Sequence, residues 1–149
     1  MQEVAMKKYK DGDLFTIPMK DGRWAIGQVI CALQDRFDRV FSFGVLSIGE
    51  EPKLPEEDRE YITFKDNGRH GHILFASATN MRRTWKVVGH LPLTEQKLAM
   101  QWFHVAGDLY HNDEWIRKLA IEEYPNYPVM SVAGNERVQI VLAGYEATS

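Results

Sequence analysis

Two apolar runs near the start of the chain are joined by an Asp-Gly pair. The first run is Leu14–Ile17, the second is Trp24–Leu33, and Asp21 and Gly22 lie between them. Gly22 adopts a positive φ without a steric penalty and Asp21 tolerates one, so the pair strongly indicates a β-hairpin. The first third of the chain is therefore expected to fold as antiparallel β structure.

Three further features extend this β pattern. Pro18 has no N–H to donate, which suits the end of a strand or an edge position. Gly27, inside the second apolar run, predicts a bulge or a sharp bend. The run Arg39–Leu46 alternates so that one face carries Phe41, Phe43 and Val45. Strands of this kind predict a small antiparallel sheet that curls into a barrel-like form.

Beyond residue 60 the pattern predicts more strands and then two helices. Strands are expected over Tyr61–Phe64, Ile73–Ala76 and Trp85–Gly89, with a turn at Lys65–Gly68. Thr94 is a suitable N-cap, with Glu95 in the first turn, for a helix whose apolar positions are Leu98, Trp102 and Val105. 

A second helix is expected to start at Asn112 or Asp113. Its apolar stripe would consist of Trp115, Ile116, Leu119 and Ala120. Pro125 and Pro128 would end it. 

Two last strands, Val129–Val132 and Val138–Leu142, are expected to pair across Gly134-Asn135. The order of strands, helices and strands predicts an α+β fold: a curled antiparallel, barrel-like sheet with two helices in the C-terminal half. The length of 149 residues fits one domain spanning residues 1–149.

Residues 50–60, here called the acidic segment, differ in composition from the rest of the chain. The segment has two prolines, two basic residues and six acidic residues, which are Glu50, Glu51, Glu56, Glu57, Asp58 and Glu60. Its net charge is −4, whereas the whole chain carries −3 with a pI near 5.9. The low pI disfavours a domain that mainly neutralises phosphates. The segment is either a solvated loop or a surface that faces a partner.

Histidines and carboxylates offer weak candidates for chemistry. His70 and His72 lie on one side of an extended stretch, but a metal site needs a third and usually a fourth ligand, and no such spacing is present. His104 and His111 lie near Asp108, Asp113 and Glu114, an arrangement that a solvated surface explains equally well. No nucleophile elbow, phosphate loop or dinucleotide fingerprint occurs, so we expect no enzyme activity, metal or cofactor.

A small basic cluster offers an alternative function. Arg82, Arg83 and Lys86 flank Trp85, a mixture that resembles a single-stranded nucleic-acid surface. Three cations are few for phosphate binding, and Trp85 could instead pack inward. One function that the sequence allows is therefore that of a small module that binds single-stranded nucleic acid or a small ligand on the sheet, and it is the alternative to a protein that binds another protein.

The expected cellular compartment depends on the single cysteine and on the absence of a secretory signal and of a membrane-spanning run in the sequence. Cys31 lies in an apolar run, where a buried thiol behaves as a small hydrophobe, and it has no partner for an internal disulfide. Met1–Lys10 is followed by Asp-Gly-Asp and not by the apolar stretch of a secretory signal. No apolar run is long enough to span a membrane. We therefore expect a cytoplasmic protein.

Two stretches of the chain are similar to a known family. Residues 9–30 combine a Gly-Asp pair, a strand ending in Ile-Pro, an Asp-Gly turn and a strand with an aromatic residue and a glycine. This order resembles the opening of the immunity protein 26 family of bacterial polymorphic-toxin and contact-dependent inhibition systems. Residues 73–75 and 85–93 resemble a later family stretch, in which a Trp leads through apolar residues to Gly and then Pro-Leu. Gln28 departs from the pattern, which has Arg there.

The resemblance implies a non-enzymatic immunity protein that binds and neutralises a cognate toxin domain, such as a nuclease. The matching residues have structural explanations, and they are Gly12, Asp13, Pro18, Asp21, Gly22, Gly27, Trp85 and Gly89. Because nucleic-acid-degrading toxins tend to be basic and charge complementarity speeds association, the expected contact surface is the acidic segment. Glu56, Glu57, Asp58 and Glu60 form its densest part.

Overall fold

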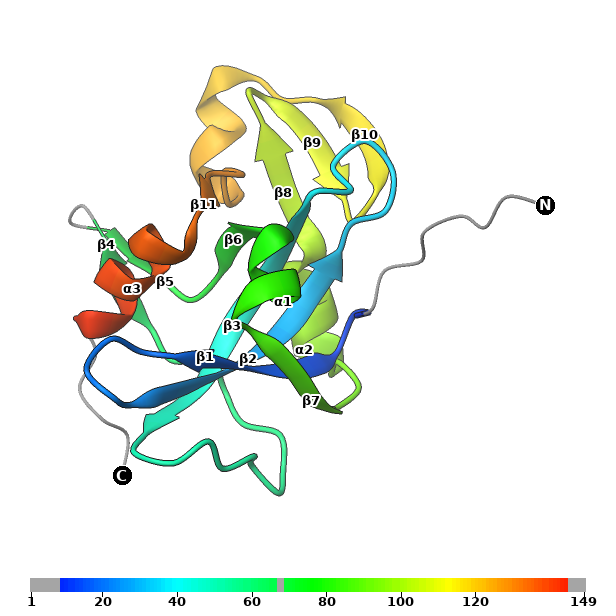
Figure 1. Ribbon diagram of the computed structural model, residues 1–149. Helices are drawn as coiled ribbons and strands as arrows, with labels where there is room; N and C mark the ends of the chain where they lie inside the picture. The colour runs from blue at the N-terminus through cyan, green and yellow to red at the C-terminus, as the bar shows by residue number, and fades with distance from the viewer. Residues whose placement is uncertain (1–8, 67–68, 145–149) are drawn as a thin grey trace.

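A six-stranded sheet forms the centre of the molecule, and a three-stranded sheet lies at one end (Figure 1). The computed structural model describes residues 9–66 and 69–144. The strands of the large sheet are, in spatial order, β11 (Val132–Ala133), β6 (Leu74–Ser77), β3 (Val40–Gly49), β2 (Trp24–Ala32), β1 (Asp13–Pro18) and β7 (Lys86–His90). All neighbours pair antiparallel except β11 with β6. The α+β class is confirmed, but β11 and β7 remain as two separate edges in the described structure, so the barrel-like form is not confirmed.

The N-terminal hairpin forms as expected. β1 and β2 pair from Leu14 opposite Gln28 to Pro18 opposite Trp24, and Gly22 in the turn has a φ of +92°. The Asp21 side chain accepts a hydrogen bond from the Arg23 backbone N–H at 3.0 Å, which closes the turn.

Gly27 lies at the predicted bulge. The register between β2 and β3 shifts between Ile26 and Gly27, and a Cβ at Gly27 would overlap the Phe15 ring. Phe15 is the cross-strand partner of Gly27 on β1, and its ring occupies the space that a side chain at position 27 would need.

Both faces of the large sheet are buried. On one face, Phe15, Phe41 and Phe43 surround Trp85, with ring centroids 5.7–6.1 Å from that of Trp85. Helix α3 (Asn135–Ala143) covers this face with Val138 and Leu142. Because neighbouring residues of a strand point to opposite faces, Leu14 and Ile26 belong to the other face. That face packs against the three-stranded sheet through Phe103 and Tyr110.

The first predicted helix is short and then changes into a strand. The Thr94 hydroxyl caps α2 (Glu95–Leu98) by accepting from the Lys97 N–H, as expected, and the 3₁₀ turn η1 (Ala99–Gln101) follows. Trp102–Val105 is strand β8 and not helix, so the helical spacing of Trp102 and Val105 was misleading. Ala106 and Gly107 both have positive φ, which makes a tight hairpin to β9 (Asp108–His111).

The second predicted helix is wrong. Glu114–Lys118 is strand β10, which pairs antiparallel with β9. Asn112, expected as a helix cap, has a φ of +55° and lies in the turn between these strands. Asn is one of the few residues that adopt this conformation readily, so it turns the chain into a hairpin. The 3₁₀ helix η2 (Ile121–Asn126) follows.

The C-terminal strand pair is also wrong in part. Val132–Ala133 forms β11, whereas Val138–Leu142 lies inside helix α3, for which Gly134 is the N-cap. Val138, Val141 and Leu142 are buried at helical spacing, so a helix, unlike a strand, points all three at the sheet.

Three short elements complete the fold. β4 (Phe64–Asp66) pairs antiparallel with β5 (Arg69–Gly71), so Lys65 and Asp66 belong to a strand and not to the expected turn, whose other residues, 67 and 68, lie outside the described residues. Of the expected strand over residues 61–64, only Phe64 lies in β4. Helix α1 (Thr79–Arg83) connects β6 to β7. Within residues 9–66 and 69–144, no helix has both the length and the apolar character needed to cross a bilayer.

Candidate functional site

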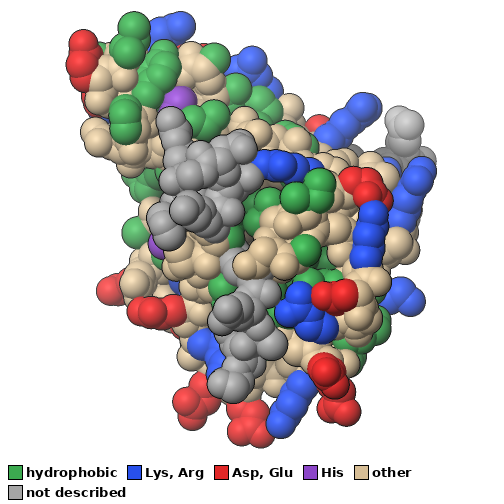
Figure 2. Space-filling view, turned by 90° about the vertical axis from the view of Figure 1, so that its left-hand side faces the viewer, with side chains coloured by type: hydrophobic (Ala, Val, Ile, Leu, Met, Phe, Trp, Pro, Cys, Tyr) green, Lys and Arg blue, Asp and Glu red, His purple; other side chains and the backbone are tan. Residues whose placement is uncertain are grey.

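The acidic segment connects β3 to the β4–β5 hairpin and presents its carboxylates to solvent. All of its acidic residues are exposed, and five of them have no hydrogen bond or ion pair to a described side chain or backbone group through their carboxylates: Glu50, Glu51, Glu56, Glu57 and Glu60. Figure 2 shows acidic side chains gathered at the lower end of the molecule, where Figure 1 places this segment. The structure thus brings the predicted residues to one end of the molecule.

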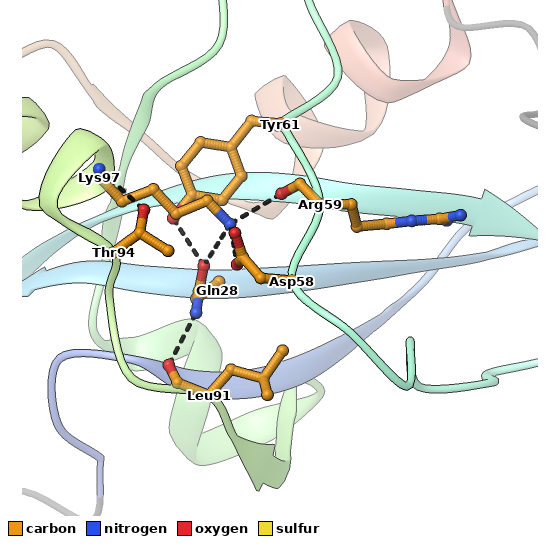
Figure 3. Close-up of polar contacts among 7 residues, drawn as sticks. All are labelled: Gln28, Asp58, Arg59, Tyr61, Leu91, Thr94 and Lys97. Carbon is orange, nitrogen blue, oxygen red and sulfur yellow. Dashed lines mark hydrogen bonds and ion pairs between the residues drawn. The ribbon is translucent and has the colours of Figure 1, made fainter.

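Asp58 differs from the other five acidic residues because it holds the segment in place. Its Oδ1 lies 2.5 Å from the Nζ of Lys97, which comes from helix α2 (Figure 3). Only 4% of the Lys97 side chain is exposed, so this cation is buried beneath the segment. The Arg59 backbone carbonyl accepts a second hydrogen bond from Nζ at 2.8 Å. Two consecutive residues of the acidic segment therefore bind one buried charge.

Gln28 and Tyr61 complete the surroundings of Lys97. Gln28 Oε1 accepts from Lys97 Nζ at 3.1 Å and from the Tyr61 hydroxyl at 2.8 Å, while Gln28 Nε2 donates to the Leu91 carbonyl. Nζ also lies 4.3 Å from the centre of the Tyr61 ring. Burial, with a smaller contribution from the negative charge of Asp58, raises the pKa of Tyr61 far above its ordinary value, so the hydroxyl remains a donor.

These contacts offset the cost of burying the Lys97 charge, and they attach the acidic segment to the sheet and to α2. A buried charge is costly unless it is paired and hydrogen-bonded, and Lys97 has a carboxylate, a carbonyl, an amide oxygen and a ring face around it. Losing any partner would raise that cost. The Lys97 cluster (Gln28, Asp58, Arg59, Tyr61 and Lys97) therefore favours one position of the acidic segment over others.

An open hollow of about 710 Å³ lies between the acidic segment and the end of β3. Ser47, Ile48 and Gly49 form its floor, and residues 51 and 53–59 form its wall. The wall combines carboxylates with the cations Lys53 and Arg59. A partner that fits here would meet a surface that is mainly, but not uniformly, negative.

Three of the residues that carry the family resemblance, Gly12, Asp13 and Gly89, lie in or next to strands β1 and β7, close to the acidic segment. Gly12 has a φ of +92°, and a Cβ there would lie 2.7 Å from the Leu91 carbonyl oxygen. Asp13 accepts from the Lys10 N–H, and its other oxygen lies 2.8 Å from His90 Nδ1. Gly89 lies against Leu54 of the acidic segment. These contacts join β1, β7 and the acidic segment.

Trp85 packs inward. It is fully buried among the phenylalanines of the large sheet, and its Nε1 donates to Asn135 Oδ1. It offers no face on which a base could stack, so the nucleic-acid platform suggested by its neighbours lacks its aromatic part. Arg82, Arg83 and Lys86 are exposed.

The two candidate histidines are separated from carboxylates. His104 is buried, its Nδ1 accepts from the Gly107 N–H, and its Nε2 has no partner within the described residues. The His111 ring stacks on Trp102 with centroids 4.5 Å apart. In the described part of the chain neither imidazole has an ion pair with a carboxylate. The general-base arrangement considered from the sequence is therefore not assembled.

Cys31 and the His70–His72 pair are the remaining candidates. Burial raises the pKa of the Cys31 thiol to about 12, which leaves it protonated and unreactive at neutral pH. The side chain of His70 lies outside the described residues. His72 is exposed.

Lys97 and Tyr61 were missed by the sequence reasoning. A lysine near the start of a short helix is typical of a solvated surface, and nothing local marks Lys97 as buried. Gln28 carried the available signal, because it is a polar residue inside the apolar run Trp24–Leu33. A buried polar side chain needs a partner, and Lys97 from α2 supplies one.

Comparisons with protein-family models, with curated proteins and with solved structures found no match to this chain.

Proposed function

We propose that this chain is an immunity protein that binds a cationic toxin domain in the cytoplasm and neutralises it by covering its working surface, without catalysing a reaction. The observation that supports this proposal is a set of five exposed carboxylates that bind no other described residue, carried by a segment that the buried Lys97 holds in place. The resemblance of residues 9–30 and 85–93 to an immunity protein family points in the same direction.

Physical reasons link this surface to fast binding. Like-charged side chains on one patch attract an oppositely charged partner over a distance and raise the association rate. A segment already held in its bound position loses less conformational entropy when the partner binds. Both effects suit a protein that must stop a toxin before damage accumulates.

Within this proposal the acidic residues have two different roles. Glu50, Glu51, Glu56, Glu57 and Glu60 would contact the toxin, because their exposed carboxylates have no partner among the described residues. Asp58 would hold the segment instead, because its carboxylate is already bound to Lys97. A variant that changes all of them together would mix these roles, so they must be tested separately.

The first test examines the neighbouring reading frames for a large secreted protein with a variable C-terminal domain, which this proposal expects to be the toxin. Co-expression of the chain should protect cells from that domain, and the two should form a complex in a pull-down. Survival of cells that lack the chain, or turnover of a substrate by the purified chain, would contradict the proposal.

The second test reverses two contact charges, Glu56→Lys and Glu57→Lys. The association rate constant with the toxin should fall about tenfold or more, and its dependence on salt should weaken. The matched control, Glu114→Lys with Glu122→Lys, changes the net charge equally at exposed positions on β10 and η2. Equal behaviour of the two variants would exclude the acidic segment as the contact surface.

A third variant, Asp58→Asn, tests the holding role. It removes the charge that faces Lys97, and we expect the free energy of unfolding to fall by about 1–3 kcal/mol. Adding Lys97→Met should recover part of that loss because no unpaired cation then remains. No recovery in the double variant would show that the pair does not act through the buried charge.

A further inference from the structure

Strand β7 is an exposed edge of the large sheet. It pairs with β1 on one side, and no hydrogen bond from its backbone to a described residue exists on the other side. Figure 1 shows β7 at the front of the molecule with no strand beyond it. Unpaired N–H and C=O groups on an edge strand are a ready template for another strand.

The side chains of β7 add apolar surface to this edge. Val87 and Val88 are 40% and 45% exposed, although both are β-branched residues suited to a packed strand. Val88 lies at a bulge, where the register with β1 shifts, and Lys86 is exposed beside it. A bulge and a lysine restrict which strands can pair here, so the partner must match this edge in particular.

Charge is unevenly distributed along the same edge. Arg82, Arg83 and Lys86 lie at its beginning, at the end of α1 and the start of β7. The acidic segment lies at its other end, where Leu54 packs against Gly89. The edge therefore runs from positive to negative.

We propose that two copies of this chain form a dimer by pairing their β7 strands antiparallel, so that the two large sheets become continuous. A two-fold axis near Val88 would place the basic end of each copy against the acidic end of the other. An edge whose charge changes from positive to negative along its length is thus complementary to the same edge of a second copy, and the two-fold axis forms each contact twice.

The residues opposite one another in this dimer are compatible. With the axis at Val88, Lys86 of one copy lies opposite His90 of the other, and that His90 contacts the carboxylate of Asp13. The two Val88 side chains face each other at the axis, where a cross-strand β-branched pair stabilises a sheet, and each Val87 lies opposite Gly89 of the other copy. Arg82 and Arg83 lie toward the acidic segment of the other copy, whose exposed glutamates are Glu50, Glu51, Glu56, Glu57 and Glu60.

The first experiment measures the molar mass of the full chain by light scattering and sedimentation across a range of concentrations, without any toxin. We expect a reversible dimer. Val88→Glu should raise its dissociation constant about tenfold or more, because a carboxylate would face its own copy at the axis. The control is Val132→Glu on β11, the opposite edge, where the valine is about equally exposed.

The second experiment exchanges charges and does not depend on the fold of the Val88 variant. Arg82→Glu with Arg83→Glu makes both ends of the edge negative, and Glu56→Lys with Glu57→Lys makes the acidic end more positive. Each variant alone should dimerise about tenfold more weakly or worse. A mixture of the two should form a heterodimer, because both contacts between them then join opposite charges.

Several outcomes would overturn the proposal. These are a monomer at every concentration, a dimer that Val88→Glu and Val132→Glu weaken equally, or a charge-exchanged mixture that does not associate. A monomer whose toxin binding depends on Val88 would assign the edge to the toxin instead. Because the dimer is measured without toxin, its failure leaves the proposed immunity function untouched.

Discussion

The large sheet and the three-stranded sheet differ in how they bury their strands. β2 is buried over almost its whole length and has side chains packed on both faces, whereas β10 is mostly exposed. At the end of the molecule that carries the small sheet, Trp115 is 52% and Ile121 is 77% exposed, and Figure 2 shows apolar side chains at that upper end. The large sheet therefore depends on close packing of aromatic rings, while the small sheet depends on two tight turns and one covered face.

The largest difference between the two sheets should appear when an aromatic side chain is removed. Phe15→Ala should lower the free energy of unfolding by about 3–5 kcal/mol, because a fully buried ring leaves a cavity beside Phe41, Phe43 and Trp85. Trp115→Ala should cost less than about 1 kcal/mol, since the indole is half-exposed. Denaturant unfolding measures both values. Similar losses would mean that the small sheet is packed as tightly as the large one.

A smaller effect should follow from adding one methyl group to the large sheet. Gly27→Ala should cost about 1–3 kcal/mol, because the new Cβ overlaps the Phe15 ring and the close-packed core has no space for it. Gly49→Ala, at the end of β3, is the control, since no atom lies within 4 Å of its Cβ position. Equal unfolding free energies for the two variants would contradict the tight contact at the bulge.

The smallest effect concerns an exposed ion pair beside the small sheet. Arg117 binds both carboxylate oxygens of Glu123, and this hydrogen bonding, helped by the Ala120 N–H, lowers the pKa of Glu123 from 4.5 to about 2. Between about pH 2 and pH 4.5 the Glu123 carboxylate is mostly charged in the folded chain and mostly protonated in the unfolded chain. Its contribution to stability is thus fully present above about pH 4.5 and is lost as the pH falls toward 2.

Melting temperatures of the original chain and of Glu123→Gln, compared across this pH range, test that contribution. The difference between them should be small, constant above about pH 4.5 and shrinking below it. A difference that stays constant down to pH 2 would show that the Arg117 pair does not lower the Glu123 pKa.

Composition alone predicts part of the candidate site. The acidic segment is visible in the sequence because six carboxylates and two prolines leave it too polar to enter a core. The separate role of Asp58 is not visible, because it depends on Lys97, which is 39 residues away and lies beneath the segment only after α2 packs beside β2. Sequence reasoning therefore predicted a solvated acidic segment but not the contact that holds it.

Local chemistry determined the N-terminal hairpin, the bulge at Gly27 and the inward-facing alternation of Phe41 and Phe43, because turn conformations and strand periodicity act over a few residues. Tertiary structure decided that Trp102–Val105 and Glu114–Lys118 are strands and that Val138–Leu142 is helical. Apolar residues in these stretches suit either periodicity when read alone. The choice was made by the neighbours available: β9 for the two strands, and a broad aromatic face of the large sheet for the helix.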